Sequence, residues 1–171
     1  MRYSEAIAMQ KQALNSAKNF ADAFPENMTR EFLGECHNNY GTLHLRILMT
    51  SRKPIPGLPP KKIIEAVKRE YHSAEVIFES LHQQDKYETD YRVQLSRIHD
   101  KQGVFYFQIR DFPLAETHFK KASEFADGLI QDEPENASFL LGKAMTEGNR
   151  GGFLAETGKT DRASEAFKTI R

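Results

Sequence analysis

The amino-acid sequence predicts an all-α protein, a solenoid of about seven antiparallel helices made of repeated helical hairpins. The first observation is a repeat in which three residues recur 48 positions later with the same identity: Gly103, Ala115 and Phe119 return as Gly151, Ala163 and Phe167. The second is the spacing of apolar residues at three and four positions, which is typical of helices with one buried side. The third observation is that the helical stretches are separated by short breaks that contain proline, glycine or asparagine.

Small and large residues hold fixed places in each repeat for a physical reason. Two helices approach closely only where one of them carries a small residue, so glycine and alanine mark the expected crossings. A large apolar side chain such as Phe119 or Phe167 fills the space beside them. A single hairpin cannot bury its apolar side alone, so neighbouring hairpins must stack. We therefore expect Gly103 and Gly151 at equivalent helix crossings.

The N-terminal half begins with a helix, residues 2–24, that matches the second helix of a hairpin and has no first helix before it. Its expected buried side consists of Ala6, Ala13, Ala17, Phe20 and Phe24. A hairpin with helices at 28–51 and 61–84 follows, and there Gly41 and Tyr71 take the places of Gly103 and Phe119. Residues 52–60 contain four prolines, which remove backbone donors and disfavour the α conformation, so this insertion is predicted to be non-helical.

The C-terminal half is predicted to hold two further hairpins, with helices at 87–109, 112–132, 137–157 and 160–170. The whole chain is interpreted as one domain, 1–171, with an orphan helix (2–24) and three repeats: 28–84 with the insertion at 52–60, 87–132, and a truncated 137–171. Asn27 and Asn136 both follow Pro-Glu, and both are expected to be helix N-caps. The orphan helix and the truncated repeat indicate either a larger parent protein or association through uncapped ends.

Composition excludes several classes of function. Lys+Arg and Asp+Glu both number 24, so no strong field favours nucleic acid or a membrane surface. The single cysteine, Cys36, forms no intrachain disulfide and favours a reducing compartment, so we expect a cytoplasmic protein. No signal peptide or membrane-spanning run is present in the sequence. No convergent set of titratable residues points to catalysis, and we expect no catalytic, cofactor or metal site.

The central segment carries the residues of a known repeat. Gly103, Tyr106, Ala115, Phe119 and Pro134 follow the pattern Leu-Gly-x2-Tyr, Ala-x3-Phe, Pro, except that Gln stands before the glycine. The chain resembles the tetratricopeptide repeat (TPR) family over nearly its whole length. The resemblance implies a right-handed solenoid, without enzymatic activity, that binds a protein or peptide along its concave face.

A recurring block in the first helix of each repeat narrows the resemblance. Together with the long helices, the block from His37 to Gly41 resembles the extended TPR arrays that follow the kinase domain in bacterial serine/threonine kinases. No kinase motif lies in this chain. The sequence also departs from the usual repeat, because it has no tryptophan and His37, His99 and Glu147 occupy that position.

The resemblance implies a peptide-binding groove lined by the first helix of each hairpin. The expected groove residues are Asn38, Thr42, Leu45 and Arg46 in the first repeat, Arg97, Asp100, Val104, Phe107 and Gln108 in the second, and Met145, Gly152 and Glu156 in the third. Asparagine can bind a peptide backbone through its donor and its acceptor, and arginine can bind a carboxylate bidentately. The competing interpretation is a solvated polar face.

Other interpretations stay open at this point. His37, His44 and Cys36 could form part of a metal site, although packed histidines fit better because no full ligand set is visible. Residues 53–59 match a basic-x-x-Pro-x-x-Pro ligand, against the simpler interpretation of a stiff connector. The leading hypothesis is a non-catalytic scaffold in a larger signalling or regulatory protein. The alternative is a structural module that forms a homo-oligomer by assembling through its ends or outer faces.

Overall fold

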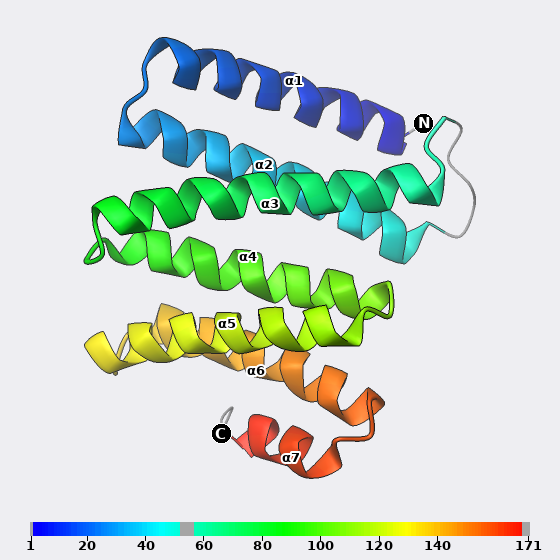
Figure 1. The fold of residues 1–171 in the computed structure, drawn as a ribbon, viewed down its shortest axis with the longest axis vertical. Coiled ribbons are helices and arrows are strands. Elements are labelled where there is room, and N and C mark those ends of the chain that lie inside the picture. The colour runs from blue at the N-terminus through cyan, green and yellow to red at the C-terminus, as the bar shows by residue number, and fades with distance from the viewer. Residues whose placement is uncertain (1, 52–56, 169–171) are drawn as a thin grey trace. The chain divides into compact units, whose positions relative to one another are not determined.

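The computed structural model describes residues 2–51 and 57–168, and these residues form seven α-helices (Figure 1). Their bounds are α1 (Arg2–Ala23), α2 (Asn27–Thr50), α3 (Pro60–Gln84), α4 (Thr89–Gln108), α5 (Phe112–Asp132), α6 (Ala137–Glu156) and α7 (Thr160–Lys168). Within the described ranges every regular element is a helix, which confirms the all-α fold class. None of these helices combines the length and hydrophobicity needed to cross a membrane.

The predicted helix bounds agree closely with the observed ones, with one correction at the proline-rich insertion. Residues 52–60 were expected to be non-helical, but Pro60 is the first residue of α3. Proline suits this position because its fixed φ angle is helical and its missing N–H would have no partner in the first turn. The part of the insertion at 52–56, and with it most of the basic-x-x-Pro-x-x-Pro match, lies outside the described residues.

One of the two predicted asparagine caps is confirmed and the other is wrong. Asn136 is the N-cap of α6, and its side-chain oxygen accepts hydrogen bonds from the backbone N–H groups of Ser138 and Phe139 at 3.0 and 3.4 Å. Asn27 instead lies inside α2, whose N-cap is Glu26. The difference is one residue of register, because α2 starts one position earlier after its proline than α6 does.

The chain divides into two compact units, which are described separately: the first unit, residues 1–85, and the second unit, residues 86–171. In the first unit, α2 packs against both α1 and α3. In the second unit, α4 packs against α5, α6 packs against both of them, and α7 packs against α6. Consecutive helices within each unit run in opposite directions, so each unit is built from antiparallel hairpins (Figure 1).

Glycines stand where helices of the same hairpin cross, and each faces an aromatic ring. A Cβ atom added to Gly103 would lie 2.6 Å from Cδ1 of Phe119, and one added to Gly151 would lie 2.6 Å from Cε1 of Phe167. In the first unit a Cβ on Gly41 would lie 2.9 Å from Cδ1 of the Tyr71 ring. These distances leave no room for a methyl group. Gly103 and Gly151 therefore lie at equivalent crossings, as predicted from the repeat.

The apolar side of α1 differs from the sequence prediction. Ala17 is buried, but Ala13 is exposed, and Phe20 and Phe24 are 50% and 55% exposed. At the position equivalent to Phe20, Leu81 of α3 and Leu129 of α5 are buried, because α2 or α4 packs beside them. The repeat pattern predicts that α1 is a second helix, but burial at these positions also needs a first helix packed beside it, and the described residues contain none before α1.

Candidate ligand pocket

A pocket of about 220 Å³ lies in the second unit, between α4 and α6, with α5 at its base. It is larger than the roughly 150 Å³ cavity that can hold benzene. Its size therefore suits one long side chain of a ligand and does not suit a folded element. Three of the predicted groove residues, Arg97, Asp100 and Met145, line this pocket.

The α4 wall is built by residues at helical spacing. Val93, Arg97 and Asp100 follow one another at four and three residues, which places them on the same side of the helix. Arg97 is exposed, whereas Asp100 is half-buried. This wall therefore presents an apolar residue and two charges of opposite sign.

The α6 wall is mainly apolar. Leu141 and Met145 lie one turn apart and are 63% and 61% exposed. Phe139 on the same helix and Leu129 of α5 continue the apolar lining, and Leu129 is only 4% exposed. Large apolar side chains this open to water at the edge of a pocket gain free energy when a ligand covers them.

Asp100 carries unused hydrogen-bonding capacity. Its Oδ2 accepts a hydrogen bond from Nδ2 of Asn149 at 2.9 Å, while its Oδ1 is buried and has no hydrogen-bond partner among the described residues. Burial raises the pKa of the Asp100 carboxyl to about 6, against the opposing effects of the Asn149 hydrogen bond and the Lys101 charge. At neutral pH the group is mostly ionised, so the pocket contains a carboxylate that is poorly solvated.

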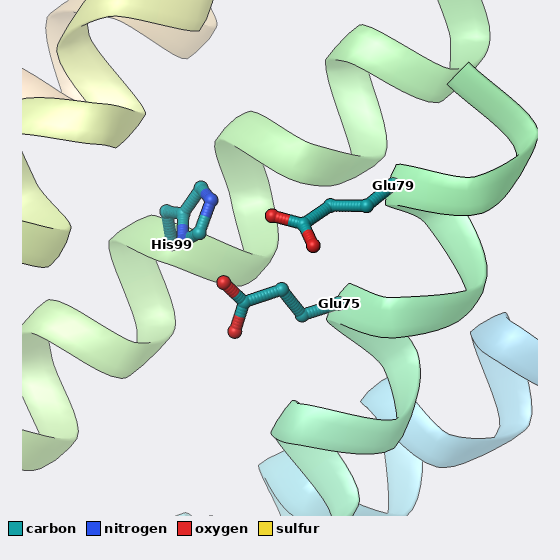
Figure 2. Close-up of side chains that lie close together, drawn as sticks. All are labelled: Glu75, Glu79 and His99. Atoms are coloured by element: carbon teal, nitrogen blue, oxygen red, sulfur yellow. The ribbon is translucent and has the colours of Figure 1, made fainter. Parts of the chain in front are cut away.

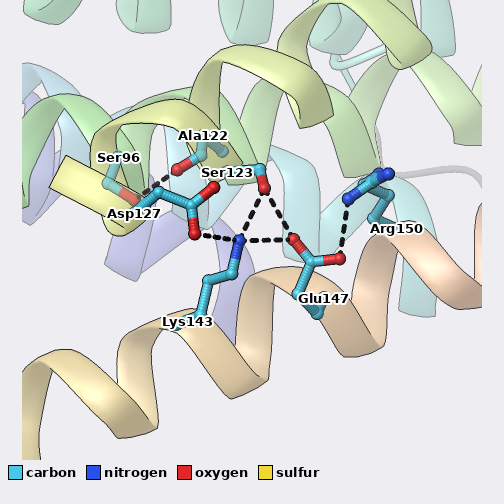
Figure 3. Close-up of polar contacts among 7 residues, drawn as sticks. All are labelled: Ser96, Ala122, Ser123, Asp127, Lys143, Glu147 and Arg150. Atoms are coloured by element: carbon cyan, nitrogen blue, oxygen red, sulfur yellow. Dashed lines mark hydrogen bonds and ion pairs between the residues drawn. The ribbon is translucent and has the colours of Figure 1, made fainter. Parts of the chain in front are cut away.

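A buried ionic network lies behind the pocket, between α5 and α6 (Figure 3). Lys143 lines the pocket, but its Nζ donates to Ser123 Oγ at 2.7 Å and pairs with Asp127 Oδ1 at 2.8 Å and Glu147 Oε1 at 2.9 Å. Glu147 is 1% exposed and also accepts from Arg150 at 2.7 Å. The Lys143 charge is therefore already compensated by protein groups.

The network has a direct effect on the carboxylate within it. Burial of Glu147 opposes ionisation, but the hydrogen bonds from Ser123 and Lys143 outweigh it, and the pKa of Glu147 is lowered. Glu147 therefore stays ionised in the interior at neutral pH, where Lys143 and Arg150 pair with its two carboxylate oxygens. Because their partners lie on both helices, the network joins α6 to α5 in one register.

Comparison with known proteins does not assign this chain to a family. No protein-family model matches the chain, and neither the curated proteins nor the solved structures contain a match. The site is therefore interpreted from its own residues.

The remaining predicted groove residues of the second unit lie elsewhere. Val104 and Phe107 pack against the core around Phe119 and Phe153, and the Phe107 and Phe153 rings meet edge-to-face at 5.6 Å. Gln108 and Glu156 are exposed outside the pocket, and Gly152 is half-buried. Of the groove residues predicted for the second unit, Arg97, Asp100 and Met145 lie around one pocket, and their role in binding stays a prediction.

In the first unit the predicted groove residues are mostly engaged within the protein. Asn38 and Leu45 are 5% and 6% exposed. Thr42 donates to the Asn38 carbonyl oxygen at 2.7 Å and accepts from the Tyr71 hydroxyl at 3.3 Å. Arg46 is exposed. Their role in binding stays a prediction.

The histidines considered for a metal site have other partners. Nδ1 of His37 lies 2.7 Å from Oε2 of Glu70, and Nδ1–H of His44 donates to the Tyr40 carbonyl oxygen at 2.9 Å. Glu75 and Glu79 lie one turn apart on α3, and both side chains extend from the same side of that helix (Figure 2). His99, drawn with them, belongs to the second unit, where its Nδ1 lies 3.2 Å from Nδ1 of His118.

Sequence reasoning missed several residues that form the pocket. Lys143 and Glu147 stand four residues apart, a spacing that predicts a helical ion pair, but it gives no sign that the pair is buried. In the sequence Glu147 stands out only because it occupies the position of the TPR tryptophan. Leu141 was missed, although it stands four residues before the predicted groove residue Met145 and forms with it an exposed apolar pair off the side of α6 that faces the core.

Proposed function

We propose that this chain is a non-catalytic, TPR-like module that binds a peptide segment of a partner protein. The observation that carries the proposal is the pocket in the second unit, where exposed Leu141 and Met145 face the charged Arg97 and Asp100. Ligand sites in proteins are typically concave, mainly apolar and supplied with a few polar groups that fix orientation. This pocket has these three properties within one unit.

The repeat assignment supports the same proposal. Gly41, Gly103 and Gly151 each face an aromatic ring of the following helix in the hairpin. Three equivalent crossings fit a helical repeat protein, and repeat proteins commonly bind partners on the surface formed by successive first helices. We extend this to a right-handed solenoid that works in the cytoplasm as part of a larger signalling or regulatory protein.

The pocket can be tested by selecting short random peptides on the full chain and measuring their affinities for variants. Leu141→Asp and Met145→Asp should each weaken the selected peptides about tenfold or more, because each places a charge on the apolar wall. Met9→Asp is the matched control, since Met9 is a 72% exposed methionine on α1. Peptides that bind the two pocket variants as tightly as the parent chain would overturn the proposal.

A second candidate function, self-association, rests on the open side of α1. The Phe20 and Phe24 rings lie 5.2 Å apart and about half of each is exposed. Apolar side chains gathered this way commonly mark contact surfaces. If the chain assembles through them, its mass by light scattering rises with concentration and Phe20→Glu/Phe24→Glu restores the monomer. A parent chain that stays monomeric at high concentration rejects this function.

A further inference from the structure

We propose that the pocket between α4 and α6 accepts a basic side chain, lysine or arginine, from its peptide ligand, with Asp100 as the group that binds the positive charge. This inference rests on the proposed function and specifies the chemistry of its ligand. It follows from the hydrogen-bonding state of Asp100, from the state of the cations around it, and from the apolar lining.

Asp100 has unused hydrogen-bond acceptors. A carboxylate has about four acceptor sites, and a buried one without donors is unfavourable. The described residues supply Asp100 with one side-chain hydrogen bond, from Asn149 at 2.9 Å. The second oxygen, Oδ1, is buried and without a hydrogen-bond partner among them. Because rotation about the Cβ–Cγ bond of aspartate is soft, either oxygen can turn toward a donor in the pocket.

The pocket lining contains two cationic side chains, Lys143 and Arg97. Lys143 is fully engaged by Ser123, Asp127 and Glu147 at 2.7 to 2.9 Å, so it has no donor to offer an acidic ligand. Arg97 is the remaining cation in the lining, and it is exposed at the rim. A ligand carboxylate placed in the interior would therefore meet the Asp100 charge without an available cation to compensate it, whereas an ammonium or guanidinium group would be paired.

The apolar lining fits the stem of a basic side chain. Leu141 and Met145 line the same pocket as Asp100 and are 63% and 61% exposed, so they can cover the stem of a side chain whose charged head lies at Asp100. Lysine and arginine carry an apolar stem below a charged head, and such stems pack well on apolar surface. The pocket volume of about 220 Å³ suits one such side chain. The lining thus matches the head and the stem of the same residue.

Replacing Arg97 should change the affinity for a basic ligand and for an acidic ligand in opposite directions. It stands one turn before Asp100 on the same wall and has the same charge as the expected ligand group. If the ligand side chain is basic, Arg97→Ala relieves repulsion and tightens binding a few-fold. If an acidic group is bound instead, Arg97→Ala weakens binding.

The test uses peptides that bind the Leu141→Asp and Met145→Asp variants more weakly than they bind the parent chain. If no such peptides are found, the proposed function itself has failed, and this outcome is seen before the inference is tested. The inference predicts that these peptides share a lysine or arginine. Replacing that residue by norleucine should weaken binding about tenfold to the parent chain and much less to Asp100→Asn. Asp90→Asn, an exposed acid on the same helix, is the matched control and should behave like the parent.

Two results would overturn the inference while leaving the pocket as a peptide site. One is a set of pocket-dependent peptides that share no basic residue. The other is an equal loss on norleucine replacement in the parent and in Asp100→Asn, which would place the ligand charge elsewhere. Circular dichroism of Asp100→Asn checks that the helices are intact, and the near-identical shape of asparagine favours that outcome.

Discussion

The hairpin α2–α3 of the first unit and the hairpin α4–α5 of the second unit share a backbone crossing but differ in the chemistry beside it. Gly41 faces Tyr71 in one, and Gly103 faces Phe119 in the other. Four residues before each glycine stands a histidine, and its partner precedes the aromatic residue: Glu70 for His37, and His118 for His99. The comparison teaches that the repeat determines where helices touch, while the polar partners are specific to each hairpin.

The helices that flank these hairpins differ more strongly. In the second unit α6 is joined to α5 by the buried network of Lys143, Glu147 and Ser123. In the first unit the surface hydrogen bond between Tyr3 and Thr50, at 3.2 Å, joins α1 to α2. A flanking helix fixed by buried charges forms one wall of the pocket in the second unit. Ligand binding is therefore expected to depend on this network.

The largest expected effect comes from removing one partner of the network. Lys143→Ala leaves Glu147, which is 1% exposed, with the Arg150 guanidinium but without its ammonium partner, and should lower the free energy of unfolding by about 2–4 kcal/mol. Denaturant unfolding measures the total, and native-state hydrogen exchange should place the loss in α5 and α6. Lys120→Ala is the control, because its pair with Glu124 is exposed and should contribute less than about 1 kcal/mol. Equal losses in the two variants would contradict the assignment.

A smaller effect is expected from the charged pair of the first unit. His37 and Arg69 lower the pKa of Glu70, although burial acts in the opposite direction. A carboxyl with a lowered folded pKa stabilises the fold above its unfolded pKa, and this stabilisation is lost as the pH falls through the folded value. Glu70→Gln should therefore cost about 1–2 kcal/mol at pH 7 and little at strongly acidic pH. A cost that does not change with pH would show that packing, not charge, is responsible.

Asp100 of the second unit should behave with the opposite sign. Its folded pKa is raised to about 6 from 3.8, so ionisation destabilises the fold, and stability falls as the pH rises between these values. Asp100→Asn should raise the free energy of unfolding at pH 7 by about 1–2 kcal/mol and remove this part of the pH dependence. Urea unfolding between pH 4 and pH 7 checks the result. A variant that is less stable than the parent at pH 7 would contradict the account of an under-solvated carboxylate.

The smallest expected effect is a gain. Gly128 lies within α5, and a Cβ atom added there would meet no atom within 4 Å. Gly128→Ala should therefore raise stability by about 0.5–1 kcal/mol, because alanine has the better helix propensity and nothing obstructs it. Thermal unfolding detects a change of this size. A loss of stability would indicate that α5 is packed more tightly on this side than the structure shows.

The hairpins were predictable from sequence because their determinants are local. Glycine opposite an aromatic ring and proline near a helix start leave signals at fixed spacing, as at Gly103, Phe119 and Pro113. The open side of α1 was not predictable, because the same alanines are buried or exposed according to which helix lies opposite. Lys143 shows the same limit: its burial follows from the packing of α6 on α5, and no local pattern of residues encodes it.

The central claim, that glycine is required where the helices of a hairpin cross, is tested most directly by a double-mutant cycle on Gly103 and Phe119. Gly103→Ala should lower the free energy of unfolding by about 1–3 kcal/mol even though alanine favours helices, because its Cβ would lie 2.6 Å from the Phe119 ring. Phe119→Leu shortens that side chain, so the double variant should be clearly more stable than the sum of the two losses allows. Additive losses, or a Gly103→Ala variant as stable as the parent, would contradict the account.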